Sequence, residues 1–195
     1  MIRNTAIMAG GQSRRFNADK TLEEVFGKKL IEHTVDAISG WADKIVVVAK
    51  DCGKYAFLEI PCTSDIYDQQ CPMVGILTAL KHYNTHVFVV AADTPLVNSE
   101  HAEKLMIACQ GHDAAVPVIE GKMHPLYSVY APSLIPILEK QIADENYRLT
   151  KAFDLSDVVY LTENEILASE NEKKSFININ TKDDLEAALD FMQGE

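Results

Sequence analysis

The stretch that decides the fold is residues 5–20, which read TAIMAGGQSRRFNADK. Its first part, Thr5–Met8, is short and mainly apolar, which predicts a buried β-strand. Two adjacent glycines, Gly10 and Gly11, follow this strand. Glycine lets the backbone approach a phosphate group closely because it carries no Cβ. The stretch therefore predicts a first strand that ends in a phosphate-binding turn.

Hydrogen-bond donors follow the glycine pair. Together with backbone N–H groups, Ser13, Arg15 and Lys20 would surround an oligophosphate with donors. The spacing is not that of a Walker loop, GxxxxGK(S/T), because Asp19 precedes Lys20, and the pattern GxGxxG is also absent. The glycine pair alone also fits a plain turn followed by a solvated charged stretch.

Short apolar runs alternate with longer helical patterns, which is typical of βαβ units and a parallel sheet. The predicted strands are Thr5–Met8, Ile45–Ala49, Leu58–Cys62, Val87–Ala92, Ala114–Val118, Leu126–Tyr130, Val158–Leu161 and Phe176–Ile179. The predicted helices are Lys28–Ser39, Val74–Tyr83, Ser99–Cys109, Leu134–Ala143 and Lys182–Met192, the last with a capping box formed by Thr181 and Asp184. Residues 163–175 are polar and charged and are expected to form a surface loop with an ill-formed helical turn.

A turn between Pro117 and Pro125 would join two strands that run antiparallel. We therefore expect an α/β fold: a three-layer αβα Rossmann-like sandwich with a mostly parallel sheet and one antiparallel strand. Ligands of such sheets bind beyond the carboxyl ends of the strands. The chain has 195 residues and no internal repeat or low-complexity linker, so one domain over residues 1–195 is expected.

The charge of the chain is unevenly distributed. The formal net charge is −11, yet residues 1–29 contain six basic and three acidic side chains. An acidic surplus argues against a non-specific nucleic-acid binder. Because salt screens charges beyond roughly 8 Å, the basic N-terminal cluster can still bind an anion locally.

The four cysteines, Cys52, Cys62, Cys71 and Cys109, contain no CxxC pair, so zinc-ligand spacing is absent. No secretory pattern opens the chain and no apolar run approaches the ~20 residues that span a membrane. The sequence therefore predicts a cytoplasmic protein with reduced thiols and no membrane contact.

A second polar signal, Asp93, follows the apolar run Val87–Ala92. A carboxylate at the end of a buried strand faces the expected ligand cleft and offers the hard oxygen ligands that Mg²⁺ prefers. Pro95 fixes the turn beyond it. Taken alone, Asp93 is equally suited to cap the next loop or helix.

Residues 8–20 resemble the pattern LAGGxSxRMGxDK of the MobA-like nucleotidyltransferases. The matching residues are Ala9, Gly10, Gly11, Ser13, Arg15, Asp19 and Lys20. Met8, Phe16 and Asn17 replace the usual Leu, Met and Gly. Asparagine adopts the left-handed backbone conformation more readily than most residues, so the last replacement is physically mild.

Later segments resemble the same family in the same order. Residues 93–95 resemble the D-(M/T)-P motif, and Asp65 resembles the acidic residue that follows the third strand. Residues 71–75 resemble the G-P-L-x-G loop with Cys71 in place of the first glycine. Residues 124–126 resemble the (Q/H)-P-L segment, and residues 178–181 the N-(I/V)-N-T motif. Turn and cap chemistry before the last helix is an alternative explanation for these asparagines.

The resemblance implies a Mg²⁺-dependent transfer of GMP from GTP to the terminal phosphate of molybdopterin, with release of pyrophosphate. It implies that Arg15, Lys20 and Asp93 are catalytic and that Asp93 binds Mg²⁺. The implied substrate-binding residues are Met8, Ala9, Gly10, Gly11, Ser13, Lys20, Asp65, Gly75, Asp93, Asn178 and Asn180. Implied partners are proteins of the cofactor pathway and apo-molybdoenzymes. The alternatives are a related transferase that uses CTP or another phosphorylated acceptor, and a non-catalytic nucleotide- or cofactor-binding module.

Overall fold

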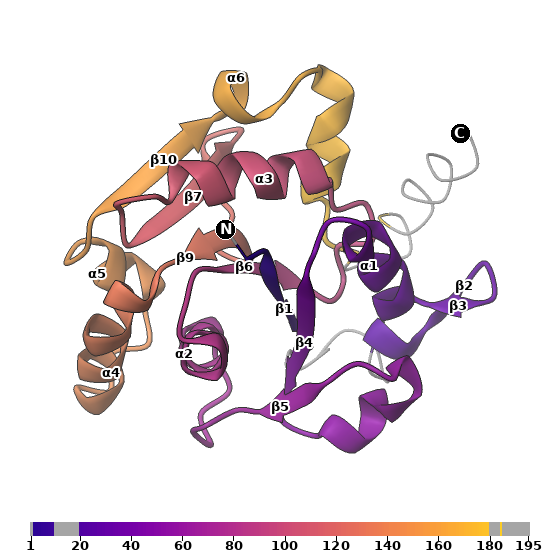
Figure 1. The fold of residues 1–195 in the computed structure, drawn as a ribbon, viewed down its shortest axis with the longest axis horizontal. Helices are drawn as coiled ribbons and strands as arrows, with labels where there is room; N and C mark the ends of the chain where they lie inside the picture. Colours follow the sequence, from indigo (N-terminus) through magenta and orange to yellow (C-terminus); the bar gives the residue numbers. More distant parts are fainter. Residues whose placement is uncertain (1, 10–19, 180–183, 185–195) are drawn as a thin grey trace.

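The computed structural model describes residues 2–9, 20–179 and 184, and its centre is a twisted eight-stranded sheet (Figure 1). The strands of this sheet are β1 (Asn4–Met8), β4 (Lys44–Ala49), β5 (Cys62–Ser64), β6 (Val87–Ala91), β7 (Ala114–Ile119), β8 (Lys122–Met123), β9 (Tyr127–Tyr130) and β10 (Val158–Thr162). Their order is β10-β7-β9-β6-β1-β4-β5, with β8 paired to β7.

Most neighbouring strands are parallel, which confirms the predicted fold class. β1 pairs in parallel with both β4 and β6, and β5 and β10 pair in parallel with β4 and β7. β9 is antiparallel to its neighbours β6 and β7. The short β8 is a second reversed strand, paired to the end of β7, so the expectation of a single antiparallel strand is corrected.

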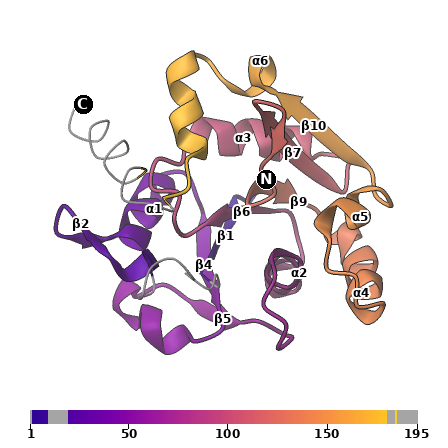
Figure 2. The same cartoon turned by 180° about the vertical axis from the view of Figure 1, so that it is seen from behind.

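Helices cover both faces of the sheet, and the two views in Figures 1 and 2 show the resulting three layers. α1 (Leu30–Ser39) and α3 (Ser99–Ala108) pack on one face. α2 (Pro72–Tyr83), α4 (Ile135–Ala143) and α5 (Leu149–Phe153) pack on the other. Side chains of a strand alternate between these layers: Ile7 joins the first cluster and Ala6 the second.

Two predicted strands are wrong, one in its bounds and the other in its existence. The apolar run Leu58–Cys62 starts inside the 3₁₀ segment η2 (Cys52–Leu58), and pairing begins only at Cys62. The predicted strand Phe176–Ile179 does not form, because Phe176 ends another 3₁₀ segment, η4 (Glu170–Phe176).

The expected loop 163–175 contains η4 and the short helix α6 (Glu163–Ile166). The helix predicted over Lys182–Met192 lies outside the described residues apart from Asp184.

A short hairpin that the sequence analysis did not predict precedes α1, and it includes Lys28 and Lys29 from the predicted start of that helix. It pairs β2 (Glu24–Val25) with β3 (Lys28–Lys29) through a two-residue turn. The turn residues Phe26 and Gly27 both have positive φ, 50° and 76°. A two-residue hairpin of this kind matches the twist of its strands, and glycine takes the second position without strain.

The structure corrects the prediction of four reduced thiols, because Cys52 and Cys62 form a disulfide. The 3₁₀ segment η2 returns the chain to the sheet edge and leaves the two Cα atoms 5.7 Å apart, within the range for such a bridge. Cys71 and Cys109 are free thiols, the first half-buried and the second buried.

Among the residues that the structure describes, none of the helices has the length and the apolar character that crossing a membrane requires.

These environments predict the order in which the cysteines react with iodoacetamide. Cys71 should react first, because burial raises the pKa of Cys109 to about 12 and leaves little thiolate there. Cys52 and Cys62 should react only after reduction. Peptide mass spectrometry of the native protein checks this order, with the reduced and unfolded chain as the control in which all four react. Rapid labelling of Cys52 or Cys62 without reductant would contradict the bridge.

Candidate active site at the carboxyl ends of the central strands

The carboxyl ends of β1, β4 and β6 form one edge of the sheet, and several of the predicted site residues lie there. The backbone ladder continues one residue beyond β1 and β6: Ala9 N donates to Val48 O at 2.9 Å, and Ala92 N donates to Met8 O at 3.0 Å. The Thr34 hydroxyl of α1 donates to Ala92 O at 3.1 Å. These bonds fix the backbone directly before Asp93.

Lys20 and Asp93 meet at this edge. The Lys20 ammonium forms an ion pair with Asp93 Oδ2, and both side chains are largely shielded from water, with 17% and 11% of their surfaces exposed. Lys20 begins the short 3₁₀ segment η1 (Lys20–Leu22), and Asp93 lies two residues after the end of β6. The pairing compensates both charges where partial burial would penalise either one alone. Two of the three residues predicted to be catalytic are therefore adjacent.

The chain after η4 lies against the Asp93 turn. Ile179 N donates to the Asp93 carbonyl oxygen at 3.0 Å, and the Thr94 hydroxyl donates to Asn178 Oδ1 at 3.0 Å. The predicted Asn178 is therefore at the site, where its carboxamide orients the residue next to Asp93. Thr94 was not predicted as a site residue, although its position after Asp93 placed it in the D-(M/T)-P motif.

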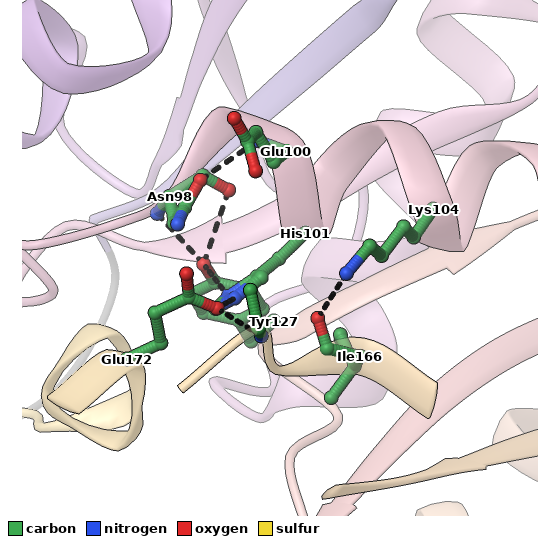
Figure 3. A network of polar contacts seen from close by, with 8 residues as sticks. Asn98, Glu100, His101, Lys104, Tyr127, Ile166 and Glu172 are labelled. Carbon is green, nitrogen blue, oxygen red and sulfur yellow. Dashed lines mark hydrogen bonds and ion pairs between the residues drawn. The ribbon is translucent and has the colours of Figure 1, made fainter. Parts of the chain in front are cut away.

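A buried polar network joins α3, β9 and η4 (Figure 3). His101 of α3 is fully buried, with its Nε2 2.9 Å from Glu172 Oε2 and its Nδ1 3.3 Å from the Tyr127 hydroxyl. Burial lowers the pKa of His101, whereas the Ala168 N–H and His101 hold the pKa of Glu172 below its usual value. A neutral imidazole beside a carboxylate places the proton on Nε2, so that Nδ1 accepts from Tyr127.

Phe176 connects this network to the site. Its ring stacks on His101 with centroids 5.4 Å apart and contacts the Tyr127 ring at 4.4 Å. Phe176 ends η4 and is followed directly by the residues that contact Asp93 and Thr94. The aromatic contacts and the His101–Glu172 hydrogen bond therefore anchor residues 177–179 over the Asp93 turn.

Asp65, Met8 and Gly75 converge at the neighbouring strand ends. A Cβ added to Gly75 of α2 would lie 3.1 Å from Met8 Sδ and 3.9 Å from Asp65 Oδ1. Burial raises the pKa of Asp65, and a hydrogen bond with the Thr78 side chain lowers it by a smaller amount. Asp65 Oδ1 is buried and has no hydrogen-bond partner among the described residues. A buried acceptor in this state favours a ligand that brings an N–H or O–H donor.

Of the remaining predicted residues, Ala9 continues β1 to the edge of the sheet where the site lies. The residues Gly10, Gly11, Ser13, Arg15 and Asn180 lie outside the described residues. Cys71, which replaces the glycine of the resembled loop, precedes α2 in an extended conformation with φ −155° and ψ 159°. Any residue adopts this conformation, so the replacement costs no backbone strain.

A mixed sheet covered by helices on both faces, with a lysine and an aspartate paired where parallel strands end, is an α/β fold of the kind that binds ligands at the carboxyl ends of its strands. The chain belongs to the MobA-like NTP transferase family, whose domain model matches residues 5–158. This confirms the family assignment made from the glycine-rich stretch.

Relatives match over almost the whole chain. A probable molybdenum cofactor guanylyltransferase of Aquifex aeolicus is 34% identical over 185 residues, 94% of this chain and 88% of that protein. A crystal structure of molybdopterin-guanine dinucleotide biosynthesis protein A from Archaeoglobus fulgidus matches with a TM-score of 0.86 at 30% identity, covering 98% of this chain and 100% of that one. The 4-diphosphocytidyl-2C-methyl-D-erythritol synthase of Anaerococcus prevotii, with a TM-score of 0.71, 16% identity and 98% coverage of both chains, shares the fold.

The buried His101 predicts a pH-dependent stability. Its pKa in the folded chain lies below the ordinary 6.5, and burial also lowers the pKa of His124. The unfolded chain therefore binds more protons as the pH falls through about 6.5, and the free energy of unfolding must fall with it. Urea unfolding at pH 7.5 and pH 5.5 measures this loss.

The control is His101→Gln, which removes one titrating group. Its absolute stability will be lower, but the change in unfolding free energy between the two pH values should be smaller than in the wild type. An unchanged difference would show that His101 does not titrate as its surroundings predict.

Proposed function

We propose that this protein transfers GMP from GTP to the terminal phosphate of molybdopterin, releasing pyrophosphate and forming molybdopterin guanine dinucleotide. The observation that carries the proposal is the shielded Lys20–Asp93 pair at the strand ends. The names of the relatives at 30% to 34% identity support the choice of substrates. Apo-molybdoenzymes and proteins of the cofactor pathway are the partners that this product would require.

The reaction needs positioning and charge compensation more than a protein nucleophile. An oxygen of the acceptor phosphate attacks the α-phosphorus of GTP in line, a new P–O bond forms, and the bond to the bridging oxygen of pyrophosphate breaks. Lys20 and Arg15 would offset the charge that grows on the phosphates and the departing pyrophosphate. One cation 4 Å from a phosphate oxygen contributes about 4 kcal/mol at an effective dielectric of 20.

We propose that a magnesium ion takes part in the reaction and that Asp93 would hold it. Within the described ranges no group of three or more His, Cys, Asp or Glu residues could hold a metal ion by itself. Magnesium at nucleotide sites is commonly held by one or two carboxylates together with substrate phosphates and water, so a single carboxylate at this edge would suffice once the nucleotide is bound. Bound there, the ion would neutralise phosphate oxygens as the transition state develops. Asp93 is the residue that would hold it.

Asp65 would bind the nucleotide rather than the metal. Its buried Oδ1 has no hydrogen-bond partner among the described residues, and an N–H or O–H group of the nucleoside would supply one. Gly75 would keep α2 close to Met8 and Asp65, because a side chain there would press on Met8. These contacts would define the nucleoside end of the site, with Lys20 and Asp93 at the phosphate end.

A thermal-shift panel with GTP, ATP, CTP and UTP, each with and without Mg²⁺, tests the proposed nucleotide. GTP at 100 times its dissociation constant should stabilise the protein by about 2.7 kcal/mol, which corresponds to a rise of several degrees in Tm. The largest shift is expected for GTP with Mg²⁺. A preference for CTP would replace the guanylyl assignment with a cytidylyl one, and no shift with any nucleotide would favour a non-catalytic module.

Lys20→Ala tests the role of the paired lysine. We expect turnover, measured as pyrophosphate release, to fall by ~10²-fold or more, as for other preorganised groups that stabilise transition-state charge. Lys28→Ala is the matched control, because Lys28 is half-exposed and pairs with Asp36 on the surface. Its turnover should equal that of the wild type. Near-normal turnover in Lys20→Ala would overturn the assigned role.

A further inference from the structure

Among the described residues, Tyr55 of η2 makes two hydrogen bonds that the proposed reaction does not explain. Its side chain is buried, with 2% of the residue exposed. The phenolic hydroxyl donates to the Ala9 carbonyl oxygen at 3.1 Å and lies 3.1 Å from Thr21 Oγ1. A phenol carries one proton, and that proton goes to Ala9, so the Thr21 hydroxyl is the donor in the second bond. One side chain thus joins two backbone segments that are 12 residues apart in the sequence.

Both partners lie beside the candidate active site. Ala9 extends β1 by one residue through its bond to Val48 O. Thr21 is buried and follows Lys20 directly in η1. The Tyr55 hydroxyl therefore ties the residue after Lys20 to the end of the strand beside Asp93.

Tyr55 is itself held firmly. Its ring packs in the apolar cluster on the α1 face of the sheet, together with Ala9 and Leu58. The Cys52–Cys62 disulfide closes the loop that contains it, and Cys62 pairs with Val47 of β4. Asp51 caps the start of η2 by accepting from Gly53 N at 3.0 Å. The hydroxyl is therefore fixed in space by the sheet, the core and the bridge.

We propose that Tyr55 is a positioning residue that holds Lys20 opposite Asp93, so that loss of its hydroxyl weakens nucleotide binding and turnover. The effect on turnover rests on the proposed function, but the effect on Lys20 does not. A lysine side chain is long and flexible, so the position of its ammonium group depends on how well its backbone is fixed. Small displacements of a catalytic group have large kinetic consequences.

The test uses Tyr55→Phe, which keeps the buried ring and removes the hydroxyl. Tyr83→Phe is the matched control: the Tyr83 hydroxyl donates to Thr5 O at 3.3 Å, which is also a β1 carbonyl but lies toward the opposite end of the strand. Both variants lose one hydrogen bond from a tyrosine to β1. Only Tyr55→Phe loses the connection to Thr21 and, through it, to Lys20.

The first measurement is independent of any nucleotide. Acetylation of lysine amines by an N-hydroxysuccinimide ester, followed by peptide mass spectrometry, reports how well Lys20 is shielded. The rate at Lys20 should rise several-fold in Tyr55→Phe and stay unchanged in Tyr83→Phe, with the half-exposed Lys28 as the internal standard. An unchanged rate at Lys20 in Tyr55→Phe overturns the inference, whatever the protein binds.

The second measurement is kcat/KM for GTP. This value should fall about tenfold in Tyr55→Phe, which is the effect of roughly one hydrogen bond. In Tyr83→Phe, kcat/KM should stay at the wild-type value. Thr21→Val should reproduce the loss, and the double variant should lose no more than the worse single one, because both changes break the same connection. Equal losses in Tyr55→Phe and Tyr83→Phe would overturn the inference. A wild type that releases no pyrophosphate contradicts the proposed function, while the acetylation result still decides the role of Tyr55.

Discussion

The burial of the central sheet on both faces is the constraint on which the rest of the structure depends. The side chains of β6 are all buried, and those of β1 are buried except for the partly exposed Met8, because helices pack on both sides. Charged side chains are costly in such a sheet, so they gather where the strands end. Lys20 and Asp93 meet at this edge and compensate one another's charge. The position of the site thus follows from the layering of the fold.

The site is held from two sides by structures that are distant from it in the sequence. On one side, Tyr55 in the disulfide-closed loop bonds to Ala9 and Thr21. On the other, the buried His101 and Phe176 anchor the segment whose Ile179 bonds to Asp93. Each support combines an apolar ring with a satisfied hydrogen bond, which gives both packing and direction. Such supports fix the geometry of polar groups that contact a ligand.

Local patterns predicted the strands with continuous apolar runs and most helices, because burial on both faces leaves a clear signal along the chain. The pattern failed at Phe176–Ile179, where the Phe176 ring packs against rings of other elements and the segment does not enter a sheet. It also failed at the Phe26–Gly27 hairpin, whose turn lacks the usual Asn-Gly signal. The disulfide could not be predicted because it depends on how η2 returns Cys62 to the vicinity of Cys52.

The sequence by itself determined the fold class, the family and the positions of Lys20 and Asp93 in their motifs, because these depend on residue type and spacing along the chain. Only the tertiary structure decided that Lys20 and Asp93 form an ion pair, that Asp65 keeps a buried oxygen without a partner among the described residues, and that Tyr55 and His101 support the site. The contacts among these features join residues that are tens of positions apart, and the burial of Asp65 likewise depends on distant segments. A contact of that kind leaves no periodic signal in a single sequence, since it exists only once the sheet has brought its strand ends together.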